Sequence, residues 1–249
     1  MSEVVAGILR ERIIDGRLAD GDLLPKQDEL LDEFPISRPT MREALRILED
    51  EGLLTVRRGN RGGSVIEVPT ADTSAYTFGL VLQSRRGSIA DLAEAIRHIE
   101  PIAAAMCARR DDRDQAVLPV LQASLDETAS AIGDGERFTT LARAFHERMV
   151  GCCGNETMIL TVGALESLWS EQERQWAQQA TSAGTYPGQS YRKAVQSAHE
   201  ALVAAIGRGQ AERASRLAAR HLQQSQHYSL QGSEEQIVRA TSLRNGLRL

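Results

Sequence analysis

The chain has 249 residues, of which 42% are apolar and 25% charged, and its formal net charge is −5. This length fits one large domain or two smaller ones with a hydrophobic core. No apolar run approaches the ~18–20 residues that cross a bilayer, and the amphipathic start MSEVVAGILRERI is unlike a signal peptide. Three cysteines without CxxC spacing indicate reduced thiols. We therefore expect a cytoplasmic protein without membrane partners.

The N-terminal quarter of the chain predicts three helices followed by a two-stranded hairpin. An apolar stripe at helical spacing covers residues 3–14, and a second, short helix is opened by Pro25. Ser37 is a good N-cap for a third helix that runs to about Asp50. The segments LLTV and SVIEV have strand character and are separated by the glycine-rich stretch RRGNRGG. This order of elements predicts a winged helix-turn-helix domain over 1–69.

Arginines gather on one side of the third helix and in the hairpin loop. On a helical wheel, Arg38, Arg42 and Arg46 form a row beside the apolar stripe. Residues 37–62 carry six arginines against four acidic residues, whereas residues 1–70 carry ten basic against fourteen acidic ones. Arginine can fork onto guanine edges while a helix N-terminus holds phosphate. The alternative, that the row only solvates a surface helix beside acidic partners, is weakened by the helix cap and the hairpin.

The stretch ISRPTMREALRILEDEGLLTVRRGNRGGSV, with DGRLADGDLLP before it, resembles the DNA-binding domain of the GntR family of bacterial transcription regulators over residues 4–68. The resemblance implies a homodimer on a palindromic double-stranded DNA operator, most often acting as a repressor. Asp28 stands where family members often carry an Arg or Glu contact. The resemblance implies that the DNA-binding residues are Ser37, Arg38, Thr40, Arg42, Arg58 and Gly59.

The remainder of the chain has a helical composition, and its glycine-containing breaks divide it into about seven helices. We expect a linker or connecting helix at 70–87, a helical bundle at 88–228, and a polar tail at 229–249 that is partly disordered or helps dimerisation. The predicted fold class is therefore mainly α, with an N-terminal winged helix-turn-helix domain and a C-terminal all-α bundle.

The segments DLAEAIRHIEPIAAAMCARR, FHERMVGCCGNETMI and HEALVAAIGRGQAERASRLAARHL resemble the FCD effector domain of the FadR subfamily of GntR regulators. The resemblance implies dimerisation and a divalent metal held by one aspartate and three histidines, which match His146, His199 and His221. The aspartate of the usual D-x-x-F-H run falls on Ala142. Three imidazoles with open positions still suit Zn²⁺ or Ni²⁺, and the expected cofactor is a divalent metal: Zn, Ni or Mn.

The same resemblance implies that Arg97 faces the cavity of the bundle and that Asn155 lies beside it. An arginine opposite a metal or histidine cluster would bind a carboxylate well. The expected effector is therefore a small carboxylate metabolite that modulates operator affinity. Three alternatives stay open: a surface ion pair of Arg97 with Glu94 or Glu100, a helix-capping role for Asn155, and a metal-independent sensor of a larger acyl or acidic ligand.

A metal-dependent hydrolase is the remote alternative, since three histidines can hold a catalytic ion. Such an enzyme needs a carboxylate as general base near the ion, and the position best placed for it is Ala142. We therefore expect no enzyme and no catalytic residues. The expected protein is a ligand-responsive, DNA-binding transcription regulator, found on the nucleoid when bound to DNA.

Overall fold

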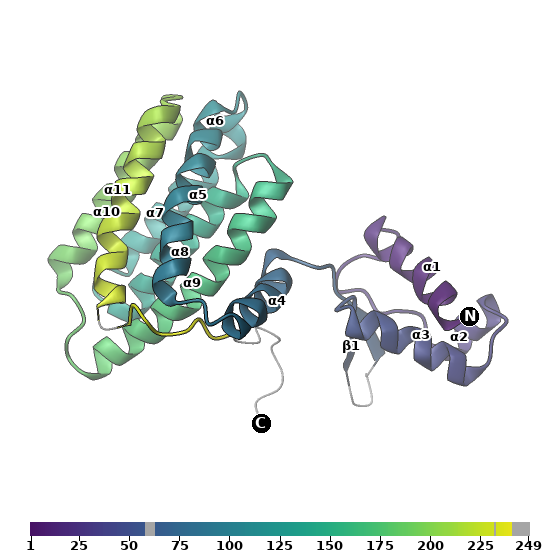
Figure 1. Cartoon of the computed structure of the whole chain (residues 1–249). Coiled ribbons are helices and arrows are strands. Elements are labelled where there is room, and N and C mark those ends of the chain that lie inside the picture. Colours follow the sequence, from purple (N-terminus) through teal and green to yellow (C-terminus); the bar gives the residue numbers. More distant parts are fainter. Residues whose placement is uncertain (58–62, 232, 241–249) are drawn as a thin grey trace. The chain divides into compact units, whose positions relative to one another are not determined.

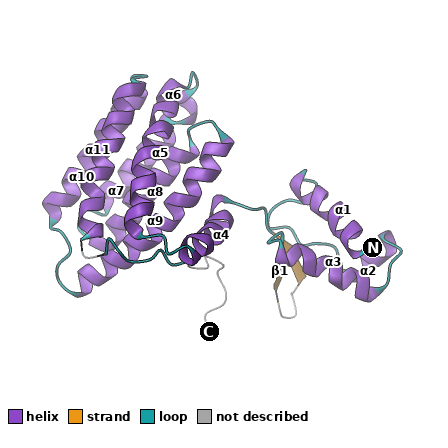
Figure 2. Ribbon diagram, in the orientation of Figure 1, coloured by secondary structure: helices purple, strands orange, loops and turns teal. Residues whose placement is uncertain are grey.

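The structure is a computed structural model that describes residues 1–57, 63–231 and 233–240. The chain divides into two compact units, Met1–Thr70 and Ala71–Leu249. Figure 1 labels their elements, and Figure 2 shows that the described elements are helices apart from one two-stranded sheet. The mainly α class expected from the sequence is confirmed.

The first unit contains three helices and a hairpin. Its elements are α1 (Ser2–Ile14), α2 (Gln27–Glu33), α3 (Arg38–Asp50), β1 (Leu54–Arg57) and β2 (Gly63–Ile66). The strands pair antiparallel, with Leu54 opposite Ile66, and both side chains join a core that also contains Leu9 and Leu48. The hairpin loop that carries Arg58 and Gly59 lies outside the described residues.

The third helix begins where the sequence predicts. Ser37 Oγ accepts a hydrogen bond from Thr40 N at 3.3 Å, which satisfies one of the free N–H groups at the helix start. The apolar face of α3 buries Met41 and Leu48 completely. Gly52 follows the helix at a φ of +79°, a left-handed conformation that glycine adopts without strain and that turns the chain into β1.

The second unit is a bundle in which the described residues form eight helices. They are α4 (Ala71–Ser84), α5 (Ile89–Arg109), α6 (Arg113–Ala116), α7 (Leu118–Ser130), α8 (Gly135–Gly151), α9 (Glu156–Ser182), α10 (Gln189–Gly207) and α11 (Ala211–Leu230). The sequence predicts about seven; the additional helix is α6, a single turn at the break near Asp111. Helix α5 packs along α11, and α9 packs against both α4 and α8 (Figure 1).

The chain after α11 folds back onto the start of α5, and we call residues 233–240 the strap. Ile89 N donates a hydrogen bond to Gln236 O at 2.8 Å, and the Val238 side chain is completely buried. This part of the expected polar tail is therefore held against its own unit. Residues 241–249 lie outside the described part of the chain.

Among the described helices, none combines the length and the apolar character that crossing a membrane requires.

Candidate functional site

Helix α3 exposes the predicted row of arginines, but its members differ in their partners. Arg38 Nη1 lies 2.8 Å from Asp28 Oδ1, and Arg46 Nη2 lies 2.9 Å from Glu43 Oε1. For Arg46, the structure thus supports the alternative that the arginine pairs with an acidic residue of its own helix. The Arg38 side chain is 63% exposed, and such surface pairs contribute only ~0–1 kcal/mol. A phosphate or a base edge can therefore compete for Arg38, and Arg42 is also exposed.

The two predicted hydroxyl contacts lie at the start of α3. Ser37 Oγ and Thr40 Oγ1 are 2.8 Å apart, and the Ser37 side chain is exposed. Backbone N–H groups and the positive end of the helix dipole point outward at this position, which makes it suitable for a phosphate group.

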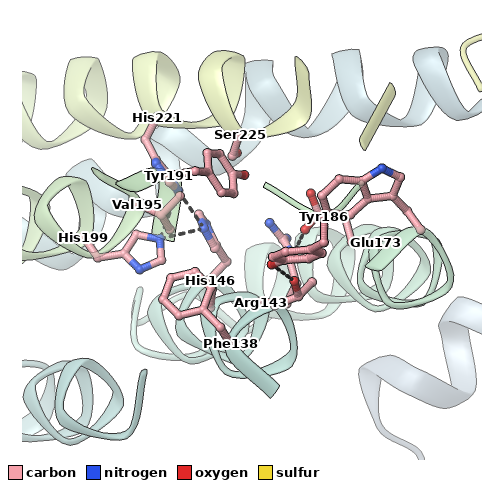
Figure 3. Close-up of a pocket in the computed structure, with 13 residues that line it drawn as sticks. Phe138, Arg143, His146, Glu173, Tyr186, Tyr191, Val195, His199, His221 and Ser225 are labelled. Atoms are coloured by element: carbon pink, nitrogen blue, oxygen red, sulfur yellow. Dashed lines mark hydrogen bonds and ion pairs between the residues drawn. The ribbon is translucent and has the colours of Figure 1, made fainter. Parts of the chain in front are cut away.

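In the second unit, the three predicted histidines converge from three helices. His146 comes from α8, His199 from α10 and His221 from α11, and all are buried (Figure 3). The Nε2 atom of His199 lies 3.2 Å from that of His146 and 3.0 Å from that of His221. The remaining separation, between His146 and His221, is 3.2 Å. Their ligand atoms form a group that could hold a metal ion.

Three mutually adjacent Nε2 atoms cannot all be satisfied by hydrogen bonds between neutral imidazoles. Each Nε2 carries either a proton or a lone pair, so at least two of the three are alike and face each other unfavourably. A cation between them interacts with three lone pairs at once. An ion ~2.1 Å from each of three nitrogens sets them ~3.0–3.4 Å apart in octahedral or tetrahedral geometry, which matches the observed separations. The donor set therefore fits one divalent ion.

Neighbouring groups orient these imidazoles. His146 Nδ1 lies 2.6 Å from Glu100 Oε1, and donation of the Nδ1 proton to this carboxylate leaves the Nε2 lone pair toward the other two rings. Carboxylates commonly hold metal-binding histidines in this way. Phe145 stacks on His199 with ring centroids 4.1 Å apart. Burial lowers the pKa of His146 to about 3 and also lowers the pKa values of His199 and His221. All three rings are therefore neutral at physiological pH, as metal-binding imidazoles must be.

Ala142 lies at the position that the missing aspartate would occupy. It stands one turn before His146 on the same face of α8, is 8% exposed, and lines the pocket beside the histidines. A methyl group here provides no carboxylate from α8 for an ion that the histidines could hold.

A buried cluster of charges adjoins the histidines. Arg143 donates to Glu166, and its Nε lies 3.4 Å from Glu173 Oε2. Burial raises the pKa of Glu100 and Glu173 and raises the pKa of Glu166 to about 8, while the Arg143 charge opposes all three shifts. Among the described residues, the buried acidic side chains are these three glutamates, and Arg143 is the buried arginine.

One pocket joins the histidines to part of this cluster. Figure 3 shows His146, His199 and His221 on one side of it and Glu173 with Tyr186 on the other. Its lining consists of Phe138, Thr139, Ala142, Arg143, His146, Glu173, Trp176, Tyr186, Tyr191, Val195, His199, His221 and Ser225.

The two predicted effector residues, Arg97 and Asn155, are not among the residues that line this pocket. Arg97 Nη1 donates to Gln226 Oε1 at 2.9 Å, and Asn155 is exposed, with its side chain accepting from Met158 N at the start of α9. The capping alternative thus describes Asn155. The arginine that lines the pocket is instead Arg143.

Comparison with known proteins gives the chain its family. Residues 91–224 match the FCD domain, and residues 1–63 match the bacterial regulatory proteins of the gntR family. The chain belongs to the gntR family. Its first unit carries the gntR match and its second unit contains an FCD domain, in agreement with the resemblance drawn from the sequence.

Curated relatives of this gntR-family chain are transcription regulators. It is 28% identical to the HTH-type transcriptional repressor NanR of Klebsiella aerogenes over 168 residues, which are 66% of this chain and 63% of NanR. It is 27% identical to the HTH-type transcriptional regulator LutR of Bacillus subtilis over 163 residues, which are 66% of this chain and 73% of LutR. The chain thus covers less than two thirds of NanR.

A solved structure supports the fold of this gntR-family chain. The GntR protein of Streptococcus agalactiae superposes with a TM-score of 0.67 at 22% identity, covering 91% of this chain and 99% of that one.

Sequence reasoning missed Arg143, Glu166 and Glu173, and it considered Glu100 only as a partner of Arg97. Arg143 had a usable signal, because it stands three residues before His146 and therefore shares its helical face. Glu166 and Glu173 lie in an α9 sequence that is rich in polar residues, and nothing in their spacing separates them from surface glutamates.

Proposed function

We propose that the chain is a homodimeric repressor of a palindromic DNA operator, and that a small carboxylate bound at a divalent metal in the FCD domain changes its operator affinity. The observation that carries the metal and the effector is the convergence of three buried Nε2 atoms in one pocket. A ligand there contacts α8, α10 and α11 together, so it can favour one arrangement of the bundle over another.

The DNA half of the proposal rests on α3. Arg38 and Arg42 are exposed and can reach base edges, while the start of the helix holds a phosphate. Each protomer would place one α3 in one half of the palindrome, so the symmetry of the dimer sets the half-site spacing. The proposed DNA contacts are Ser37, Arg38, Thr40, Arg42, Arg58 and Gly59.

The metal half rests on the donor set. His146, His199 and His221 would hold the ion, and imidazole donors favour Zn²⁺ or Ni²⁺ over Mn²⁺. A bound ion supplies open coordination positions that a carboxylate can fill. Glu100 fixes the tautomer of His146, and Ala142 leaves space beside the ion where a protein carboxylate is absent.

Metal content is the direct test. We would measure Zn, Ni and Mn by ICP mass spectrometry in untagged wild type, in His199→Ala, and in His98→Ala as the control, because the His98 side chain is 76% exposed. Near-stoichiometric metal in wild type and His98→Ala, but not in His199→Ala, is expected. Metal-free wild type after incubation with each ion would refute the metal site and favour the metal-independent sensor.

Operator affinity is the second readout. An operator is first selected from random double-stranded DNA. Fluorescence anisotropy then measures how tightly the metal-loaded and the EDTA-treated protein bind it, with and without each carboxylate. Carboxylates that shift the midpoint only for the metal-loaded protein support the proposal. A midpoint that no carboxylate shifts in either form contradicts it.

A further inference from the structure

Beside the histidines, the pocket is lined by aromatic and acidic side chains. Trp176, Tyr186 and Tyr191 line it together with the Glu173 carboxylate, which is contributed by α9. Figure 3 shows Tyr186 and Glu173 away from the histidines and Tyr191 beside His221. Aromatic faces and a carboxylate both attract a cation. Arg192 already places its guanidinium 5.5 Å from the centre of the Tyr186 ring, so one of these rings has a cation as neighbour.

The arginine of the pocket lies beside two protein carboxylates. Arg143 donates to Glu166, which does not line the pocket, and lies beside Glu173, which does. A ligand carboxylate that approached Arg143 would have to displace Glu173 or share the guanidinium with it. Two carboxylates brought together in a buried site repel each other strongly.

We propose that the effector is a carboxylate that also carries a protonated amine, with its carboxylate on the metal and its ammonium between Glu173 and the Tyr186 ring. This inference rests on the proposed function, since it requires the metal at His146, His199 and His221. It excludes dicarboxylates as the preferred ligand class. Tyr191 and Ser225 line the same pocket and provide hydroxyl groups for the remaining polar atoms of the ligand.

The test compares ligands that differ only in the group at one end. Zn²⁺-loaded full-length protein is titrated by calorimetry with three series of matched chain length: ω-amino carboxylates, ω-hydroxy carboxylates and dicarboxylates of three to five carbons. The amino carboxylate of the best length should bind about tenfold or more tightly than the dicarboxylate of that length, because the second carboxylate of the dicarboxylate would lie close to the like charge of Glu173. The hydroxy compound should fall between them.

Two variants identify the residue responsible. Glu173→Gln keeps the size and hydrogen bonding of the side chain but removes its charge, so the preference for the amine should disappear. Glu166→Gln is the matched control: it also removes a carboxylate partner of Arg143, but outside the pocket lining, and the preference should remain. Zinc content and far-UV circular dichroism verify that both variants keep the fold and the ion.

The outcomes separate this inference from the proposed function. Dicarboxylates or hydroxy carboxylates that bind wild type as tightly as the amino series overturn the inference and leave the metal-dependent carboxylate sensor standing. Failure of every series to bind zinc-loaded wild type overturns both. An amine preference that survives in Glu173→Gln and is lost in Glu166→Gln overturns the assignment to Glu173.

Discussion

Removing one imidazole from the histidine cluster should abolish the stabilisation that a divalent metal gives to the second unit. Both tryptophans of the chain, Trp169 and Trp176, lie on α9, so tryptophan fluorescence follows the unfolding of this unit. An ion that binds only the folded state stabilises it by ~2.7 kcal/mol at a free concentration of ~100 times Kd. Each kcal/mol shifts Tm by ~2–4 °C for a unit of ~150–250 residues. We therefore expect the zinc-loaded protein to melt ~5–11 °C above the EDTA-treated protein.

Each variant serves as its own reference in this assay. His199→Ala loses the stacking on Phe145 and leaves a cavity, which lowers Tm with and without metal. The difference between the zinc and EDTA curves cancels that cost and should fall to nearly zero. His98→Ala, with its exposed side chain, should keep the full difference. A zinc shift in His199→Ala as large as that of wild type would place the ion elsewhere and refute the three-histidine site.

Three further predictions concern single residues. Arg38→Ala should weaken operator binding by ~1–3 kcal/mol per contact and relax specificity, with α3 still folded by circular dichroism; unchanged affinity would contradict its assignment to base edges. Ala142→Asp should raise zinc affinity, measured by chelator competition, by at least the ~10–100-fold that even outer ligand partners contribute; a lower affinity would show that the position does not face the ion. Burial raises the pKa of Cys107 to about 12, so its thiolate is scarce at neutral pH. Mass spectrometry should therefore find Cys107 unalkylated after folded protein is treated with iodoacetamide. Rapid labelling of the folded protein would contradict the burial of Cys107.

The first unit could be predicted from the sequence almost element by element, because its signals are local. The Ser37 cap, the apolar face of α3 and the glycine-rich hairpin each depend on residues within one turn or one loop. The partners of the arginines are set partly by tertiary contacts. Asp28 reaches Arg38 from a different helix, and sequence spacing does not reveal that pair.

In the second unit, the resemblance identified the three histidines but not the groups around them. His146, His199 and His221 are far apart in sequence, and helix packing alone brings them together. The sequence gives no sign that Glu173 is buried, because its neighbours along α9 are polar. In the structure, Ser229 on α11 covers it and donates a hydrogen bond to it at 3.1 Å. Arg97 contacts Gln226 rather than the pocket. A sequence motif does not determine which face of the long helix α5 is turned toward the pocket, so this contact could not be predicted.

The strap brings the described end of the second unit close to the helix at its beginning, α4. Ala240 N donates to Gln83 Oε1 across 157 residues of sequence, and a Cβ atom placed on Gly79 of α4 would lie 3.3 Å from Ala240 Cα. The described end of the unit thus lies beside its first helix, and a linker spanning about two turns of α4 would join them. A chain cut instead at the exposed Gly133 and rejoined across the strap would keep the bundle's helix contacts. The packing of the bundle is therefore compatible with more than one position of the chain ends.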